Sequence, residues 1–184
     1  MKASMEKINR IILVDADLVS HFINAGEAEN IHLVFPNNPI QMLDKVHAEL
    51  QNWKNVHVGF VIADLLKKKR IKLIDFPEDN EEIKKEYFHI KKILFKGDGE
   101  SACLAVARYN KNILASSNLR DIKNYCIMHK IDYLTTMDFL CHALSTGVFD
   151  EARCNVFLQK VIAAGGKLPV NRMKEYTCRV IDFL

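Results

Sequence analysis

Three acidic residues stand at positions where a carboxylate is not expected. Asp15 directly follows the apolar run 11–14, and Glu49 stands on the apolar stripe of a helix-like segment. Glu100 follows a turn that contains two glycines. Carboxylates that converge repel one another, and a hard divalent cation with oxygen ligands, Mg²⁺ or Mn²⁺, offsets that repulsion. A water bound to such a cation is suited to hydrolysing a phosphodiester bond. If the three acids meet, we expect a metal site for that reaction.

Each acid also has a purely structural interpretation. Asp15 could simply cap the helix that follows it, because an aspartate oxygen accepts hydrogen bonds from first-turn amides. Glu49 could lie half-solvated at the edge of its stripe, and the helix dipole favours Glu100 wherever a helix begins. The seven histidines show no paired spacing typical of metal ligands. The choice therefore depends on whether the fold brings the acids together.

Alternating segments of strand-like and helix-like pattern would position these acids. The β-branched run 11–14 predicts a strand buried on both faces, as in a parallel sheet. Further strands are predicted at 71–76, 112–117 and 131–135. Helices are predicted at 18–25, 39–53, 56–66, 78–96, from 100 onward, and at 118–128, 137–145, 151–164 and 170–183. This alternation predicts an α/β fold, a three-layer α/β/α sandwich with a mainly parallel central sheet and helices on both faces.

The predicted sheet would gather the polar residues at one edge. In open parallel sheets, ligands bind outside the carboxyl ends of the strands. Asp15 and the pair Ser117 and Asn118 each follow a predicted strand. Glu49 and Glu100 lie on predicted helices that could face the same edge. We therefore expect one acidic site at the carboxyl ends of the strands.

Length and composition indicate an ordinary globular chain. Residues 1–184 are predicted to form a single domain, with a helical extension over about 150–184. The net charge of +3 is too small to indicate nucleic-acid binding by itself. No apolar run approaches the roughly 20 residues that span a bilayer. The first ten residues show no secretory signal, so we expect a cytoplasmic location.

The five cysteines are odd in number, scattered along the chain, and without a C-x-x-C pair. Regular spacing would indicate a disulfide framework or a thiolate zinc site. We therefore expect neither of these, and we expect reduced thiols.

The order of these features resembles the PIN domain, a family of metal-dependent ribonucleases that includes many toxins of bacterial toxin–antitoxin pairs. The resemblance covers most of the chain. Three acidic motifs of the family are matched: the D-x-[S/T/N/D] form at 15–17, the second acidic motif at 46–50 and the G-x-G-E form at 97–100. Residues 116–121 stand where the family usually has T-x-D after a strand. Residues 157–169 look like the C-terminal end of one PIN-like subgroup. The order and spacing of these motifs together carry the resemblance.

The resemblance implies a PIN-like fold and a Mg²⁺- or Mn²⁺-dependent endoribonuclease. Asp15, Glu49 and Glu100 would be the catalytic, metal-ligating acids. Asn118, helped by Asp121, would take the fourth position, where asparagine can ligate the metal or hold a metal-bound water but removes a charge. The implied partner is an RNA substrate, with an antitoxin protein or a second copy of the chain as further partners and no membrane.

Two other functions are compatible with the same residues. A haloacid-dehalogenase-type phosphatase would use the D-x-D of Asp15 and Asp17 with a strand ending at Ser116 or Ser117. That family also needs a lysine and a late acidic pair, and no late pair stands out here. A PIN-like module that binds RNA or protein without cutting is favoured by Asn118 and by the modest net charge.

Overall fold

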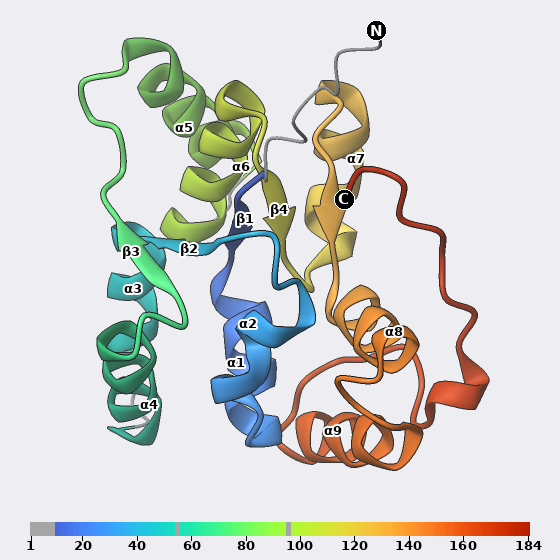
Figure 1. The fold of residues 1–184 in the computed structure, drawn as a ribbon. Helices are drawn as coiled ribbons and strands as arrows, with labels where there is room; N and C mark the ends of the chain where they lie inside the picture. The colour runs from blue at the N-terminus through green and yellow to red at the C-terminus, as the bar shows by residue number, and fades with distance from the viewer. Residues whose placement is uncertain (1–9, 54–55, 95–96) are drawn as a thin grey trace, which may run out of the picture.

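The computed structural model describes residues 10–53, 56–94 and 97–184, apart from the side chains of Leu119 and Asp121. Across these residues, a five-stranded parallel sheet forms in the order β3-β2-β1-β4-β5 (Figure 1). The strands are β1 (Ile12–Val14), β2 (Ile40–Leu43), β3 (Lys72–Ile74), β4 (Ile113–Ala115) and β5 (Tyr133–Leu134). The helices are α1 (Ala16–Ala25), α2 (Ile31–Val34), α3 (Asp44–Gln51), α4 (Val56–Lys67), α5 (Glu81–Ile93), α6 (Asp98–Asn110), α7 (Leu119–His129), α8 (Thr136–Thr146) and α9 (Glu151–Ala163), with 3₁₀ turns η1 (Ala28–Asn30) and η2 (Met173–Glu175). The predicted α/β/α sandwich is confirmed.

β1 is the central strand. All three of its side chains are completely buried, as expected for a strand covered on both faces. Ile12 pairs with Ile40 of β2 on one side and with Ile113 of β4 on the other. The continuous apolar run therefore marks the middle of the sheet, and its carboxyl end leads directly into Asp15.

The order of the strands places a switch point beside β1. From β1 the chain winds outward through β2 to β3, and it then returns to the opposite side of β1 for β4 and β5. Connections that leave two neighbouring strands in opposite directions open a crevice at the carboxyl ends of those strands. The residues that follow β1 and β4 therefore stand at the place where ligands bind in folds of this kind.

The segment 39–53 corrects one prediction. A single helix was expected there, but the chain forms β2 and then α3. The side chains of Met42, Val46, Glu49 and Trp53 recur at helical spacing, which made the segment look like one helix. Ile40 and Met42 instead pair with residues of β1 and β3, and tertiary pairing of this kind overrides local pattern.

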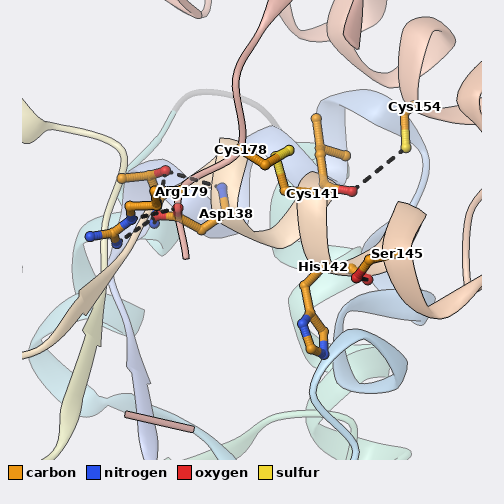
Figure 2. The surroundings of a disulfide bond; sticks show 9 residues. Asp138, Cys141, His142, Ser145, Cys154, Cys178 and Arg179 are labelled. Carbon is orange, nitrogen blue, oxygen red and sulfur yellow. Dashed lines mark hydrogen bonds and ion pairs between the residues drawn. A yellow bond between two sulfur atoms is a disulfide. The ribbon is translucent and has the colours of Figure 1, made fainter. Parts of the chain in front are cut away.

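The C-terminal segment corrects two further predictions, one about its helices and one about its cysteines. Only α9 of the predicted helical extension over 150–184 is helical. Residues 164–184, which we call the tail, contain the short turn η2 and otherwise no helix. A disulfide joins Cys141 of α8 to Cys178 of the tail, so the expectation of five reduced thiols was wrong (Figure 2). The remaining cysteines are buried and free. The tail is held by α8 across this bond instead of by helical hydrogen bonds of its own.

Within the described ranges, no helix combines the length and apolar character needed to cross a bilayer.

Candidate active site

Asp15 is a buried carboxylate at the carboxyl end of β1. One of its oxygens, Oδ1, accepts a hydrogen bond from the amide of Ala16 (2.8 Å), so the residue does cap α1. The other, Oδ2, accepts one from Ser116 Oγ (3.1 Å). The pKa of Asp15 is raised from 3.8 to about 7, chiefly by burial and also by the charges of Asp17 and Glu49, against the lowering effect of the two hydrogen bonds. The structural interpretation of Asp15 as a helix cap is therefore confirmed, and its chemical role stays a prediction.

The residues after β4 connect Asp15 to a second predicted acid. Ser116 Oγ accepts a hydrogen bond from the Asn118 amide (3.3 Å). The side chain of Asn118 donates from Nδ2 to Glu100 Oε1 on α6 (3.4 Å). Three of the predicted site residues thus lie in one hydrogen-bonded chain, which runs from Asp15 through Ser116 and Asn118 to Glu100.

Glu49 approaches the start of α6 from α3. Its Oε2 accepts a hydrogen bond from the Gly99 amide (3.3 Å). A Cβ at Gly99 would lie 2.7 Å from that oxygen and 3.2 Å from Val46 Cα. A Cβ at Gly99 would therefore require the flexible end of Glu49 to move and the backbone at Val46 to shift by a few tenths of an ångström, so glycine allows the two helices this close contact without adjustment. The G-x-G-E pattern of the sequence therefore reflects a packing requirement as well as an acid.

Cys103 lies near enough to all three acids to be influenced by their charges. Its buried thiol donates a weak hydrogen bond to the carbonyl of Val14 (3.8 Å), the last residue of β1. Burial raises its pKa well above the ordinary value, and the charges of Asp15, Glu100 and Glu49 raise it further. One buried sulfur atom therefore lies within the electrostatic field of all three carboxylates.

The convergence is looser than a complete set of metal ligands. In the part of the chain that the structure describes, no group of three or more His, Cys, Asp or Glu side chains is arranged to hold a metal ion. The carboxylates of Glu49 and Glu100 instead bond to the Gly99 amide and the Asn118 side chain. The side chain of Asp121 lies outside the described atoms. Metal ligation by these residues stays a prediction.

Sequence reasoning missed a second polar group beside the acids. Ser117 Oγ is hydrogen-bonded to Thr136 Oγ1, and Thr136 Oγ1 is 2.9 Å from His21 Nδ1. Burial lowers the pKa of His21, which favours the neutral ring. No local pattern links α1, β4 and α8, so only the topology of the sheet could have indicated this contact.

The helices before and after β5 begin differently. The side chain of Asn118 makes no cap hydrogen bond to α7. A capping box is present at the start of α8, between Thr135 and Asp138. Asn118 is therefore directed toward Glu100 instead of toward its own helix.

One cavity lies at the other end of the sheet, away from Asp15. It measures about 1180 Å³ and is lined by residues that precede strands, including Ile11 and Asn112. No predicted site residue lines it. A second cavity of about 600 Å³ is lined by Ser117 and Asn118 and adjoins the acidic chain. The smaller cavity is therefore the one relevant to chemistry at Asp15.

Comparison with known proteins supports the fold. The chain is similar to a chain in a solved structure described as the crystal structure of VapBC2 from Rickettsia felis bound to a DNA fragment from their promoter. The match has a TM-score of 0.52 and 19% sequence identity, and it covers 68% of this chain and 98% of that chain. No family model matches the sequence, and no curated protein matches it. At 19% identity this similarity bears on the fold alone, and that fold is consistent with a PIN-like α/β/α sandwich.

Proposed function

We propose that the chain is a Mg²⁺- or Mn²⁺-dependent endoribonuclease that hydrolyses RNA phosphodiester bonds at the acidic site. One observation carries this proposal. A buried carboxylate, Asp15, stands at the switch point of a parallel sheet and is connected through Ser116 and Asn118 to Glu100. Glu49 reaches the same region from α3.

The side chains present fit a hard divalent cation. Asp15, Glu49 and Glu100 offer carboxylate oxygens, and Asn118 offers an amide oxygen, which are the donors that Mg²⁺ and Mn²⁺ prefer. Burial disfavours the ionised form of Asp15, and a nearby cation would favour it. Mg²⁺ keeps several waters and uses only one or two protein carboxylates in many sites. The resemblance adds Asp121 to the proposed ligands.

The chain's own contacts prepare the site for this chemistry. When bound, the cation supplies an activated water and neutralises charge on the phosphate. Ser116 Oγ and the Ala16 amide each hold one oxygen of Asp15. The Asn118 side chain holds one oxygen of Glu100, and the Gly99 amide holds one oxygen of Glu49. Groups fixed in this way need little reorganisation during the reaction, which favours catalysis.

A protein partner belongs to the same proposal. The neighbouring solved structure is a toxin–antitoxin complex, and by that similarity we propose an antitoxin-like protein as a partner of this chain. A second copy of the chain is the other proposed partner. We place the activity in the cytoplasm, as the sequence led us to expect.

Cleavage of a mixed-sequence single-stranded RNA tests the proposal. We expect the wild type to cut in Mn²⁺ and to be inactive in EDTA. Asp15→Asn, Glu49→Gln and Glu100→Gln should each lower the rate by about 100-fold or more, since even the loss of a residue that only orients a ligand lowers activity roughly 10- to 100-fold. Metal-dependent cutting by all three variants at the wild-type rate would contradict the assignment.

Asp17→Asn is the matched control. Asp17 lies two residues after Asp15, on the exposed side of α1. The ribonuclease proposal predicts that this variant cuts RNA at nearly the wild-type rate. A phosphatase that uses the D-x-D would lose its activity in both variants. A protein that binds RNA in Mn²⁺ without cutting it would instead be the non-catalytic module.

A further inference from the structure

The cavity beside Asn118 has a chemistry opposite to that of the acidic site. It measures about 600 Å³, and among the side chains that the structure describes no Asp or Glu lines it. Arg120 and Lys167 lie along its wall, together with the aromatic ring of Tyr176. Neither of the two cations forms an ion pair within the described residues. The cavity therefore presents unpaired positive charge and an aromatic surface next to a cluster of acids.

The two walls of this cavity come from distant parts of the chain. One wall follows β4 and β5 and includes Ser117 and Thr135. The other wall is the tail, which contributes Lys167, Leu168 and Tyr176. Figure 1 shows the tail in red, leaving α9 and running along the side of the molecule. The cavity exists because the tail is held in place there.

Three contacts fix the tail wall. The disulfide Cys141–Cys178 ties it to α8 (Figure 2). Arg179 donates from Nε and Nη2 to the two carboxylate oxygens of Asp138, at 2.7 and 2.8 Å. The Met173 amide donates to the side chain of Asn155 on α9 (2.8 Å). A wall anchored on both sides of Tyr176 can present that ring in a defined position.

The opposite wall presents a fixed hydroxyl group. Ser117 Oγ is hydrogen-bonded to Thr136 Oγ1, which is itself bonded to the buried His21 ring. His21 and Thr136 are buried, so the packing around them fixes both partners of this hydroxyl chain. A polar group of a ligand in the cavity would meet a hydroxyl whose orientation is already set.

We propose that this cavity is a nucleotide subsite for single-stranded RNA. One base stacks on Tyr176, and the flanking phosphates contact Arg120 and Lys167. This inference rests on the proposed function, since it assigns that function's substrate to a place next to Asn118. Aromatic stacking and backbone phosphate contacts are the two interactions by which proteins hold single strands. Acids on one side of Asn118 and cations on the other would separate the reacting phosphate from the bound nucleotide.

Binding of a labelled ten-nucleotide single-stranded RNA in EDTA, followed by fluorescence anisotropy, tests the subsite without cleavage. We expect Tyr176→Ala to weaken binding about tenfold, as for the loss of one stacked base. Tyr176→Phe keeps the ring and should bind nearly as the wild type. Lys167→Gln and Arg120→Gln should each weaken binding and lower the slope of log affinity against log salt by about 1.

Lys174→Gln is the charge-matched control, because Lys174 is an exposed residue of the tail that does not line the cavity. It should bind RNA nearly as the wild type does. Wild-type affinity in Tyr176→Ala and Lys167→Gln would overturn the subsite, whatever the cleavage assay shows. Selective loss of affinity in those variants, with no metal-dependent cutting by the wild type, would support the subsite and contradict the proposed nuclease activity.

Discussion

The carboxyl group of Asp15 is buried, and burial disfavours its ionised form. Burial and nearby acids raise its pKa to about 7, so near neutral pH the folded protein holds a proton that the unfolded chain releases. The raised pKa therefore stabilises the folded state fully at low pH, and this stabilisation is lost as the pH rises from about 4 through about 7. A shift of about three pH units corresponds to about 4 kcal/mol.

This linkage predicts that Asp15→Asn stabilises the metal-free protein at high pH. Asparagine has nearly the same shape and carries no charge to bury. In EDTA at pH 8, the free energy of unfolding should rise by up to about 4 kcal/mol, and the gain should shrink as the pH falls below 7. Urea unfolding of both proteins at pH 5 and pH 8 measures it. An equal difference at both pH values would contradict the raised pKa.

A second prediction for a single residue concerns the neutral side chain of Asn118. Asn118→Asp replaces a hydrogen bond to Glu100 with a pair of like charges. Without metal, the free energy of unfolding should fall by about 1 kcal/mol or more, since a hydrogen bond is worth about that much. The added carboxylate should also strengthen Mn²⁺ binding, so that Mn²⁺ raises the melting temperature more than in the wild type. A smaller rise than in the wild type would argue against a ligand position.

Among the elements, the contact between α3 and α6 decides where Glu49 lies. Gly99→Ala would place a Cβ 2.7 Å from Glu49 Oε2 and 3.2 Å from Val46 Cα, so the Glu49 carboxylate must move and the two helices must separate by a few tenths of an ångström. Overpacking of this kind is expected to cost about 1–3 kcal/mol. Thermal unfolding should show a lower melting temperature, and the response to Mn²⁺ should weaken because Glu49 is displaced.

Gly59→Ala is the control for that substitution. Gly59 lies in α4, and a Cβ there would meet nothing within 4 Å. Alanine favours helix over glycine by roughly 0.5–1 kcal/mol, so this variant should be more stable than the wild type. If both alanine variants melted at the same temperature, the close approach at Gly99 would not be a constraint.

For the whole molecule, the disulfide is the covalent one of the three contacts that hold the tail in place. Cys141 and Cys178 are separated by 37 residues, and the chain-entropy model assigns a loop of that size about 3–4 kcal/mol. Cys178→Ser should therefore lower the melting temperature under oxidising conditions and weaken RNA binding in the tail-walled cavity. In reducing agent the two proteins should become alike. A difference that persisted in reducing agent would assign the effect to the serine itself.

Local patterns were enough to predict β1, the position of Asp15 at the end of that strand, and the start of α6 after a turn with two glycines. A buried β-branched run and a G-x-G-E turn can each be recognised from a few consecutive residues. The contact between Asp15 and Ser116 needed more, because it follows from the register that pairs Val14 with Ala115. Long-range partners explain the remaining errors. Strand β2 is defined by its neighbours in the sheet, and the tail by a disulfide that no sequence spacing indicates.

Direct titration of Mn²⁺ into the metal-free protein, followed by isothermal calorimetry, tests the central claim that these acids form one cation site. The wild type should bind Mn²⁺ and release protons near pH 7, because Asp15 is partly protonated there and a ligand must be ionised. Asp15→Asn should lose this binding, and the exposed-site control Asp17→Asn should keep it. Equal Mn²⁺ binding by wild type and Asp15→Asn would show that the buried carboxylate serves the fold alone.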